Sequence, residues 1–145
     1  MACLLATVVC LTIFWHFFYP ALKLRSLAED GDSYAQYVYA LALQYGLSGR
    51  TKNQVEAARW FQKSAEQNYW GAQLALGCRY AEGNGVTKDL IQAHAWLSLA
   101  KAQEGTNKQS IAWRLLPELE EKMSSEQKTE ATKLARELSE RFNRK

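Results

Sequence analysis

The chain has 145 residues, 48% of them hydrophobic and 23% charged, which supports one globular domain rather than two. The net charge is only +3, and Lys23 and Arg25 stand beside a hydrophobic segment, so little basic excess remains for a nucleic-acid interface. Cys78 is the one cysteine beyond that segment, which excludes an intramolecular disulfide framework and favours a packed thiol over a reactive one.

The first predicted element is a hydrophobic segment, residues 1–22, which is long enough to cross a bilayer as a helix. Its C-terminal end is aromatic, as is typical of a membrane interface, and His16 lies near that end, where a neutral imidazole costs little. We therefore expect a single-pass membrane anchor, followed by a linker or half-helix over residues 23–32. A cleaved signal peptide is the alternative, although a basic n-region is missing. Acylation at Cys10 is a further alternative, although Val9 is large for such a site. Lys23 and Arg25 favour a cytoplasmic location for the rest of the chain by a bias of two residues.

After this segment the chain repeats itself, which is the most informative feature of the sequence. The first half of the unit recurs at an offset of 37 residues and the second half at 36, so the difference falls in a loop, where an insertion costs little. The matching pairs are Ala35 with Ala72, Tyr39 with Leu76, Leu43 with Tyr80, Gly46 with Gly83, Gly49 with Gly85, Ala57 with Ala93, and Trp60 with Trp96. Gly31, Asn68 and Gly105 mark the unit boundaries. The sequence therefore predicts two repeats, residues 33–68 and 69–105.

Each repeat is predicted to contain two helices, because its apolar residues recur at helical spacing. Asn53 and Asp89 are suitable N-caps for the second helix of each pair. The expected helices are Ser33–Tyr45, Asn53–Gln67, Gly71–Glu82 and Asp89–Gln103.

Glycine and asparagine positions refine this prediction. Gly77 inside a helix costs about 1 kcal/mol relative to alanine, which indicates that a neighbouring helix comes too close for a side chain. Gly83 and Gly85 provide the backbone freedom for the turn between the two helices. Asn68 and Gly105 suit the left-handed residue just past a helix end.

Residues 106–145 are predicted to cap the stack. One helix is expected from Ser110 to Lys122 with a kink at Pro117, and another from Ser125 to Asn143, where Ser124 and Gln127 form a capping box. The last helix carries an apolar stripe on one side only, as a terminal helix that covers an exposed core requires. The stripe consists of Ala131, Leu134, Ala135, Leu138 and Phe142.

The segments Ala72–Gly105 and, more weakly, Ala35–Asn68 resemble the Sel1-like repeat family, a branch of helix-pair solenoids related to tetratricopeptide repeats. The resemblance implies an all-α fold, namely a short solenoid with a helical cap. It also implies that the protein is a non-enzymatic scaffold and needs no cofactor. Ala40 and Arg50 depart from the family pattern, and the paired cysteines of its disulfide-linked branch are absent, so no activity of that branch is carried over. The matching signature residues are Gly31, Ala35, Trp60, Ala72, Leu76, Gly77, Tyr80, Gly83, Gly85, Ala93, Trp96 and Gly105.

Candidate catalytic residues are few, and no Cys/His cluster has metal-ligand spacing. His94 is the obvious general-base candidate, but the sequence identifies neither a nucleophile nor an orienting carboxylate for it. Glu120 and Glu121 are adjacent on a helix, so their carboxylates point apart. A packed or surface imidazole, and no enzyme, is therefore predicted.

Aromatic and polar residues on the first helices are the better candidates for a function. Tyr69 and Trp70 stand at the boundary between the repeats, where they either anchor a partner or seal the seam. A second group projects away from the expected core and is predicted to line the inner surface. This group consists of Tyr37, Leu41, Gln44, Leu74, Cys78 and Ala81.

The predicted function is binding of another protein at a bacterial membrane, with self-association as a possible variant. An immunity protein that neutralises a secreted toxin, a structural envelope component and a small hydrolase are the alternatives. Family habit favours the periplasmic side of the membrane and the two basic residues favour the cytoplasmic side, so the side stays open.

Overall fold

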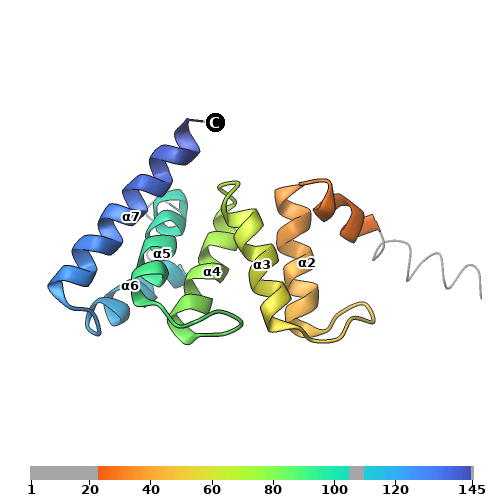
Figure 1. The fold of residues 1–145 in the computed structure, drawn as a ribbon, viewed down its shortest axis with the longest axis horizontal. Helices are drawn as coiled ribbons and strands as arrows, with labels where there is room; N and C mark the ends of the chain where they lie inside the picture. The colour runs from red at the N-terminus through yellow and green to blue at the C-terminus, as the bar shows by residue number, and fades with distance from the viewer. Residues whose placement is uncertain (1–22, 105–109, 145) are drawn as a thin grey trace, which may run out of the picture.

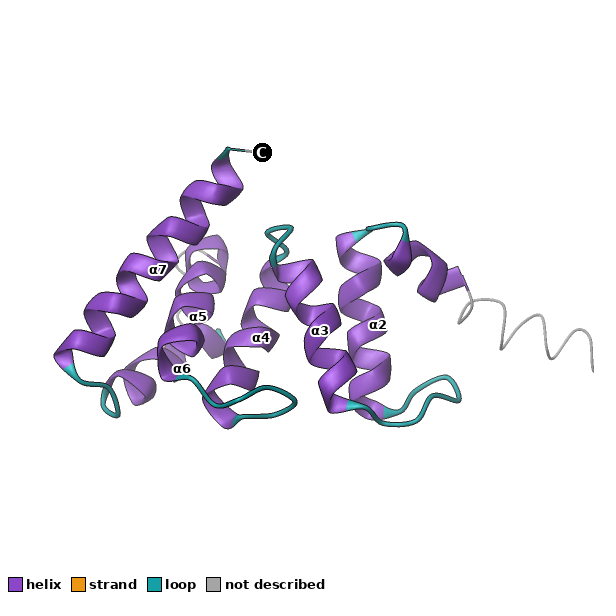
Figure 2. Cartoon of the chain, viewed as in Figure 1, coloured by secondary structure: helices purple, strands orange, loops and turns teal. Residues whose placement is uncertain are grey.

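The fold is a row of helices. The computed structural model describes residues 23–104 and 110–144, and within these ranges the chain is helical without a strand (Figure 2). A helical stretch over residues 23–29 leads into α2, and the helices then follow one another in chain order along the molecule, with α7 at the far end (Figure 1). Their bounds are α2 Ser33–Tyr45, α3 Gln54–Ala65, α4 Trp70–Glu82, α5 Leu90–Glu104, α6 Ile111–Glu120 and α7 Ser125–Asn143. The predicted helical solenoid is confirmed for these residues.

The helices begin and end close to the positions that the sequence indicated. The side chain of Asn53 accepts a hydrogen bond from the backbone N–H of Glu56 at 3.0 Å, and Asp89 accepts from the N–H groups of Ile91 and Gln92. The capping box of Ser124 with Gln127 is formed. Asn68 has φ 64°, the left-handed conformation expected after a helix end, while Gly105 lies outside the described residues.

The core lies between the paired helices of each repeat and continues from one repeat to the next. Ala57, Phe61 and Ser64 of α3 are buried, while Trp60 is half-buried against Tyr39. The predicted stripe of α5 is buried throughout; it consists of Ala93, Trp96, Leu97 and Ala100. A Cβ atom on Gly77 would lie 2.7 Å from Cγ of Leu97, so α4 and α5 touch at this glycine as predicted.

The C-terminal helices cover the last face of the stack. α7 packs along α5 and buries Ala131 and Leu138, with the rest of the predicted stripe half-buried. α6 also packs against α5, and it continues through Pro117 to Glu120 as one helix. α5 is thus packed between α4 and the two C-terminal helices, α6 and α7.

The predicted membrane anchor, residues 1–22, lies outside the described residues, with Cys3, Cys10 and His16. In residues 23–104 and 110–144 no helix combines the length and the apolar character that crossing a bilayer requires.

Candidate functional site

The first surface of interest is α2, whose thirteen residues SYAQYVYALALQY contain no charged side chain. Tyr34 and Tyr45 are eleven residues apart, about three helical turns, so they share one side of the helix. They are 61% and 63% exposed. Tyr39 points the other way and is buried. An uncharged helix that keeps two rings in water is a candidate contact surface.

Two tyrosines of α2, Tyr34 and Tyr37, contact Tyr69 at the start of α4. The Tyr69 ring centroid lies 5.1 Å from that of Tyr37 and 6.1 Å from that of Tyr34, and Tyr37 also packs on Phe61 of α3 at 5.8 Å. Gly71 permits this approach, because a Cβ atom there would lie 3.0 Å from the Tyr69 ring. Burial raises the pKa of the Tyr37 and Tyr69 phenols, so both stay neutral at physiological pH. We call Tyr34, Tyr37, Tyr45, Tyr69 and Trp70 the aromatic face.

The residues predicted to bind a partner lie in different surroundings. Tyr37 and Leu41 are half-buried against the core shared by the two repeats, and Tyr69 is half-buried in the ring cluster. Gln44 is hydrogen-bonded to α4. Trp70, the first residue of α4, is 45% exposed. The structure thus brings Tyr37 and Tyr69 together at the seam and leaves Trp70 open to solvent.

Arg79 of α4 is a residue that the sequence analysis missed. It is buried, stacks on the Phe61 ring at 4.8 Å and donates to Gln44 Oε1 at 2.8 Å. It also donates to the backbone oxygens of Gln54 and Asn84 and to the side chain of Gln54. One guanidinium thus ties α2, α3 and the α4–α5 loop together. The only indication in the sequence was a single cation within an otherwise apolar stretch of the helix.

A groove opens between α4 and α6, with a volume of about 180 Å³. Cys78 and Ala81 form its α4 side. Burial and then the nearby Glu82 carboxylate raise the pKa of the Cys78 thiol, so it stays protonated and is not an activated nucleophile. The other lining residues are aliphatic at the floor and charged at the rim: Leu90, Leu97, Leu115, Leu119, Glu82, Lys88, Glu118 and Lys122.

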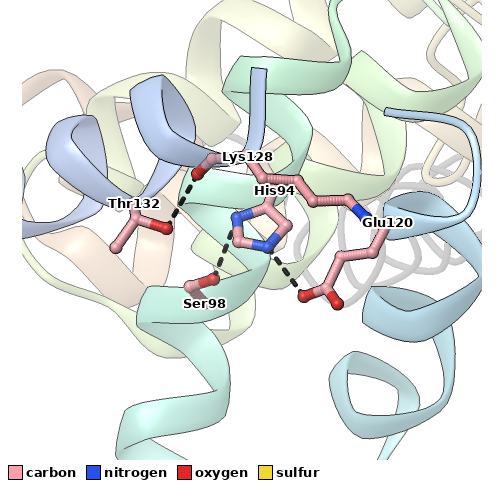
Figure 3. A network of polar contacts seen from close by, with 5 residues as sticks. All are labelled: His94, Ser98, Glu120, Lys128 and Thr132. Atoms are coloured by element: carbon pink, nitrogen blue, oxygen red, sulfur yellow. Dashed lines mark hydrogen bonds and ion pairs between the residues drawn. The ribbon is translucent and has the colours of Figure 1, made fainter. Parts of the chain in front are cut away.

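His94 has the partners that the sequence did not reveal (Figure 3). Its Nε2 lies 3.0 Å from Oε1 of Glu120 on α6, and its Nδ1 lies 3.4 Å from Oγ of Ser98, while Glu121 ends α6 and is exposed. Serine, histidine and glutamate are the residue types of an acyl-transfer triad. However, Ser98 lies in the interior of α5, where the backbone N–H groups bond within the helix and cannot form an oxyanion hole.

The histidine network therefore connects α5 to α6 and offers no complete catalytic site. The His94 side chain is 10% exposed, so a substrate has little access to it. Across residues 23–104 and 110–144, no three His, Cys, Asp or Glu side chains are grouped so that they could hold a metal ion. The aromatic face and the groove are the candidate binding surfaces considered below.

Comparison with known proteins identifies the repeats. Residues 33–69 and 70–104 each match the family model of the Sel1 repeat. The chain is therefore a member of the Sel1 repeat family.

Two crystal structures of bacterial proteins share this fold. A protective antigen present in uropathogenic Escherichia coli strains, displaying an SLR fold, aligns with 83% of this chain at a TM-score of 0.73 and 31% sequence identity. A Sel1 repeat protein from Oxalobacter formigenes aligns with 70% of the chain at a TM-score of 0.63 and 37% identity. The chain covers 26% and 28% of the lengths of these two proteins. No curated protein matches the sequence.

Proposed function

We propose that this protein is a non-enzymatic scaffold that binds a partner protein through the aromatic face, at a bacterial membrane to which residues 1–22 anchor it. Sel1 repeats generally mediate binding to other proteins, and both repeats of this chain contribute to the face. The observation that carries the proposal is the exposure of Tyr34 and Tyr45 on a helix without charge.

The physical reason is the cost of leaving such rings in water. Tyrosine and tryptophan bury large apolar areas while keeping a polar tip, so they are enriched among the residues that dominate binding energy. Trp70 has no ring or cation packed on it among the described residues, unlike Trp60, which lies beneath Lys63 at 4.2 Å. The exposed ring surfaces of Trp70, Tyr34 and Tyr45 are therefore accessible to a partner protein.

The first test is affinity capture of the tagged full-length protein from gently solubilised native membranes, compared with a Tyr34→Ala/Tyr45→Ala variant. The variant should lose a stoichiometric partner, and Trp70→Ala should weaken its capture. Val55→Ala on α3, also an exposed apolar position, is the matched control and should keep the partner. Equal recovery by the tyrosine variant would overturn the proposed binding surface.

The membrane setting has its own test. Removal of residues 1–22 from the tagged chain should move it from the membrane fraction to the soluble fraction, because no helix of the described residues can replace that segment as a span. Retention of the shortened chain in the membrane fraction after a high-salt wash would contradict the anchor.

A further inference from the structure

The two candidate binding surfaces differ in how narrowly they define a ligand. The groove between α4 and α6 has an aliphatic floor and equal numbers of carboxylates and ammonium groups at its rim, so it favours no particular occupant. The aromatic face has a more one-sided chemistry, because α2 carries no charged side chain over its thirteen residues. A charged partner residue that lay on α2 would lose hydration without gaining an opposite charge. The aromatic face therefore favours an uncharged segment.

The rings of the aromatic face also carry hydrogen-bonding groups that the protein does not use. In the described part of the chain, the hydroxyls of Tyr34, Tyr37, Tyr45 and Tyr69 and the indole N–H of Trp70 have no hydrogen-bond partner. Each phenol has one O–H to donate, and an indole N–H is a donor only. The carbonyl groups along α2 are bonded within the helix, so this surface offers few acceptors. A segment that fits must supply carbonyl oxygens and bring few N–H groups of its own.

Among the regular conformations of a polypeptide, polyproline II meets these requirements. Its carbonyl groups are free because it forms no internal hydrogen bonds, and proline has no N–H group to leave unpaired. A partner helix uses its carbonyl groups internally, and an added strand needs a sheet edge, which residues 23–104 and 110–144 do not contain. Aromatic surfaces bind proline-rich segments in this conformation, and the stiffness of such segments keeps the entropy cost of binding low.

The arrangement of the rings suits a segment of this kind. Tyr34 and Tyr45 are eleven residues apart, which is about 16 Å along the axis of α2. A polyproline II helix rises about 3.1 Å per residue, so about five residues cover that distance. The rings of Tyr37 and Tyr34 are tilted by 47° and 67° to the ring of Tyr69, so none of the three covers a neighbour face to face.

We propose that the aromatic face binds a proline-rich segment of the partner in the polyproline II conformation, laid along α2 between Tyr34 and Tyr45. This inference rests on the proposed function as a protein-binding scaffold, and it adds the chemistry of the segment that is bound. The pyrrolidine rings of the segment pack on the aromatic rings, and its carbonyl groups accept hydrogen bonds from the tyrosine hydroxyls.

The test uses the full-length protein in detergent and a fluorescent octaproline peptide, capped at both ends so that it carries no charge. Fluorescence anisotropy should show saturable binding of octaproline. A capped octapeptide of alternating glycine and serine should bind at least about tenfold more weakly, because a flexible chain must be ordered. Tyr34→Ala/Tyr45→Ala should weaken octaproline binding at least about tenfold, as expected when anchoring rings are lost. Val55→Ala, the matched control on α3, should leave it unchanged.

A second variant tests the hydrogen bonds alone. Tyr34→Phe/Tyr45→Phe keeps both rings but removes two donors, so octaproline binding should weaken about two- to tenfold for each hydroxyl lost. Both residues are exposed, so the variant should keep its fold, and thermal unfolding verifies this. Octaproline binding as tight as that of the wild type would overturn the polyproline II assignment, because that assignment depends on free carbonyl groups.

The outcomes separate this inference from the proposed function. Absence of octaproline binding, or equally tight binding of the glycine–serine peptide, would overturn the inference even where Tyr34→Ala/Tyr45→Ala abolishes capture of the partner. Octaproline binding that depends on the two tyrosines supports the inference even where the same variant still captures the partner, a result that overturns only the proposed function.

Discussion

At the scale of single residues, Gly77 is the position where the sequence alone indicated a close helix contact. Its α-hydrogen faces Leu97, and an added Cβ atom would meet Cγ, Cδ2 and the backbone nitrogen of that residue at 2.7, 2.9 and 3.1 Å. A larger side chain must push α4 and α5 apart, because close-packed interiors have no free volume to give.

We therefore expect Gly77→Leu to lower the free energy of unfolding by about 1–3 kcal/mol or more, through overpacking of the α4–α5 contact. Chemical denaturation measures the change. Ala102→Leu on the exposed side of α5 adds a leucine without this contact and should stay within about 0.5 kcal/mol of the wild type. Equal stability of the two variants would contradict the close approach.

Arg79 leads to the second prediction at this scale. Arg79→Lys keeps a positive charge but loses the planar fork that reaches Gln44, Gln54 and Asn84. It should destabilise the protein by about 1.5–3 kcal/mol, the range for hydrogen bonds to charged groups, and it should loosen the seam between the repeats. Hydrogen exchange of the amides in α2 and α4 would detect this, and unchanged protection there would show that Arg79 does not join the repeats.

These two residues also show what can be predicted from sequence. The contact at Gly77 was predictable, because a glycine inside a periodic helix lowers helix stability and is usually kept for close packing. The partners of Arg79 were not, since Gln44 is 35 residues away and the pairing depends on how two repeats dock. The same holds for His94 and Glu120, which are 26 residues apart. Cys78 and Ala81 were expected on the inner surface, but the groove also requires the position of α6.

At the scale of elements, the loop between α2 and α3 can be compared with the equivalent loop between α4 and α5. Gly49 and Gly85 are equivalent in the repeat and have nearly the same positive φ, 74° and 77°. A Cβ atom on Gly85 would collide with the backbone carbonyl of Gln54 at the start of α3, whereas one on Gly49 would meet nothing within 4 Å. The second loop is thus packed against the first repeat, and the first loop is open.

Gly49→Ala should therefore lower the free energy of unfolding by about 1–2 kcal/mol, which is the strain of an alanine in the left-handed conformation. Gly85→Ala adds a backbone collision to the same strain and should cost clearly more, because a carbonyl fixed in α3 cannot rotate away. Thermal unfolding of the two variants under identical conditions measures the difference. Equal decreases in the unfolding temperature of the two variants would mean that the loop between α4 and α5 does not contact α3.

At the scale of the whole molecule, the solenoid is a chain of contacts between neighbouring helices, and α7 covers the far side of the second repeat by packing along α5. α7 lies at the far end of the row of helices (Figure 1). Its outer side is polar, and it buries Ala131 and Leu138 against the preceding helices. In such arrays each unit is stabilised by the interface with the next, so a terminal unit without a cap leaves an apolar face in water. The cap therefore stabilises repeat 2 directly and repeat 1 through it.

Leu138→Asp in the full chain tests this. The substitution places a charge at a position that is 8% exposed, which should undock α7 and destabilise the protein by several kcal/mol. The loss of amide protection should be largest in α7 and α5, smaller in α4, and least in α2, since coupling passes through successive interfaces. Arg136→Asp, which places the same side chain at an exposed site of the same helix, should leave protection unchanged. Uniform loss of protection from α2 to α7 would mean that the molecule unfolds as one unit rather than as a stack.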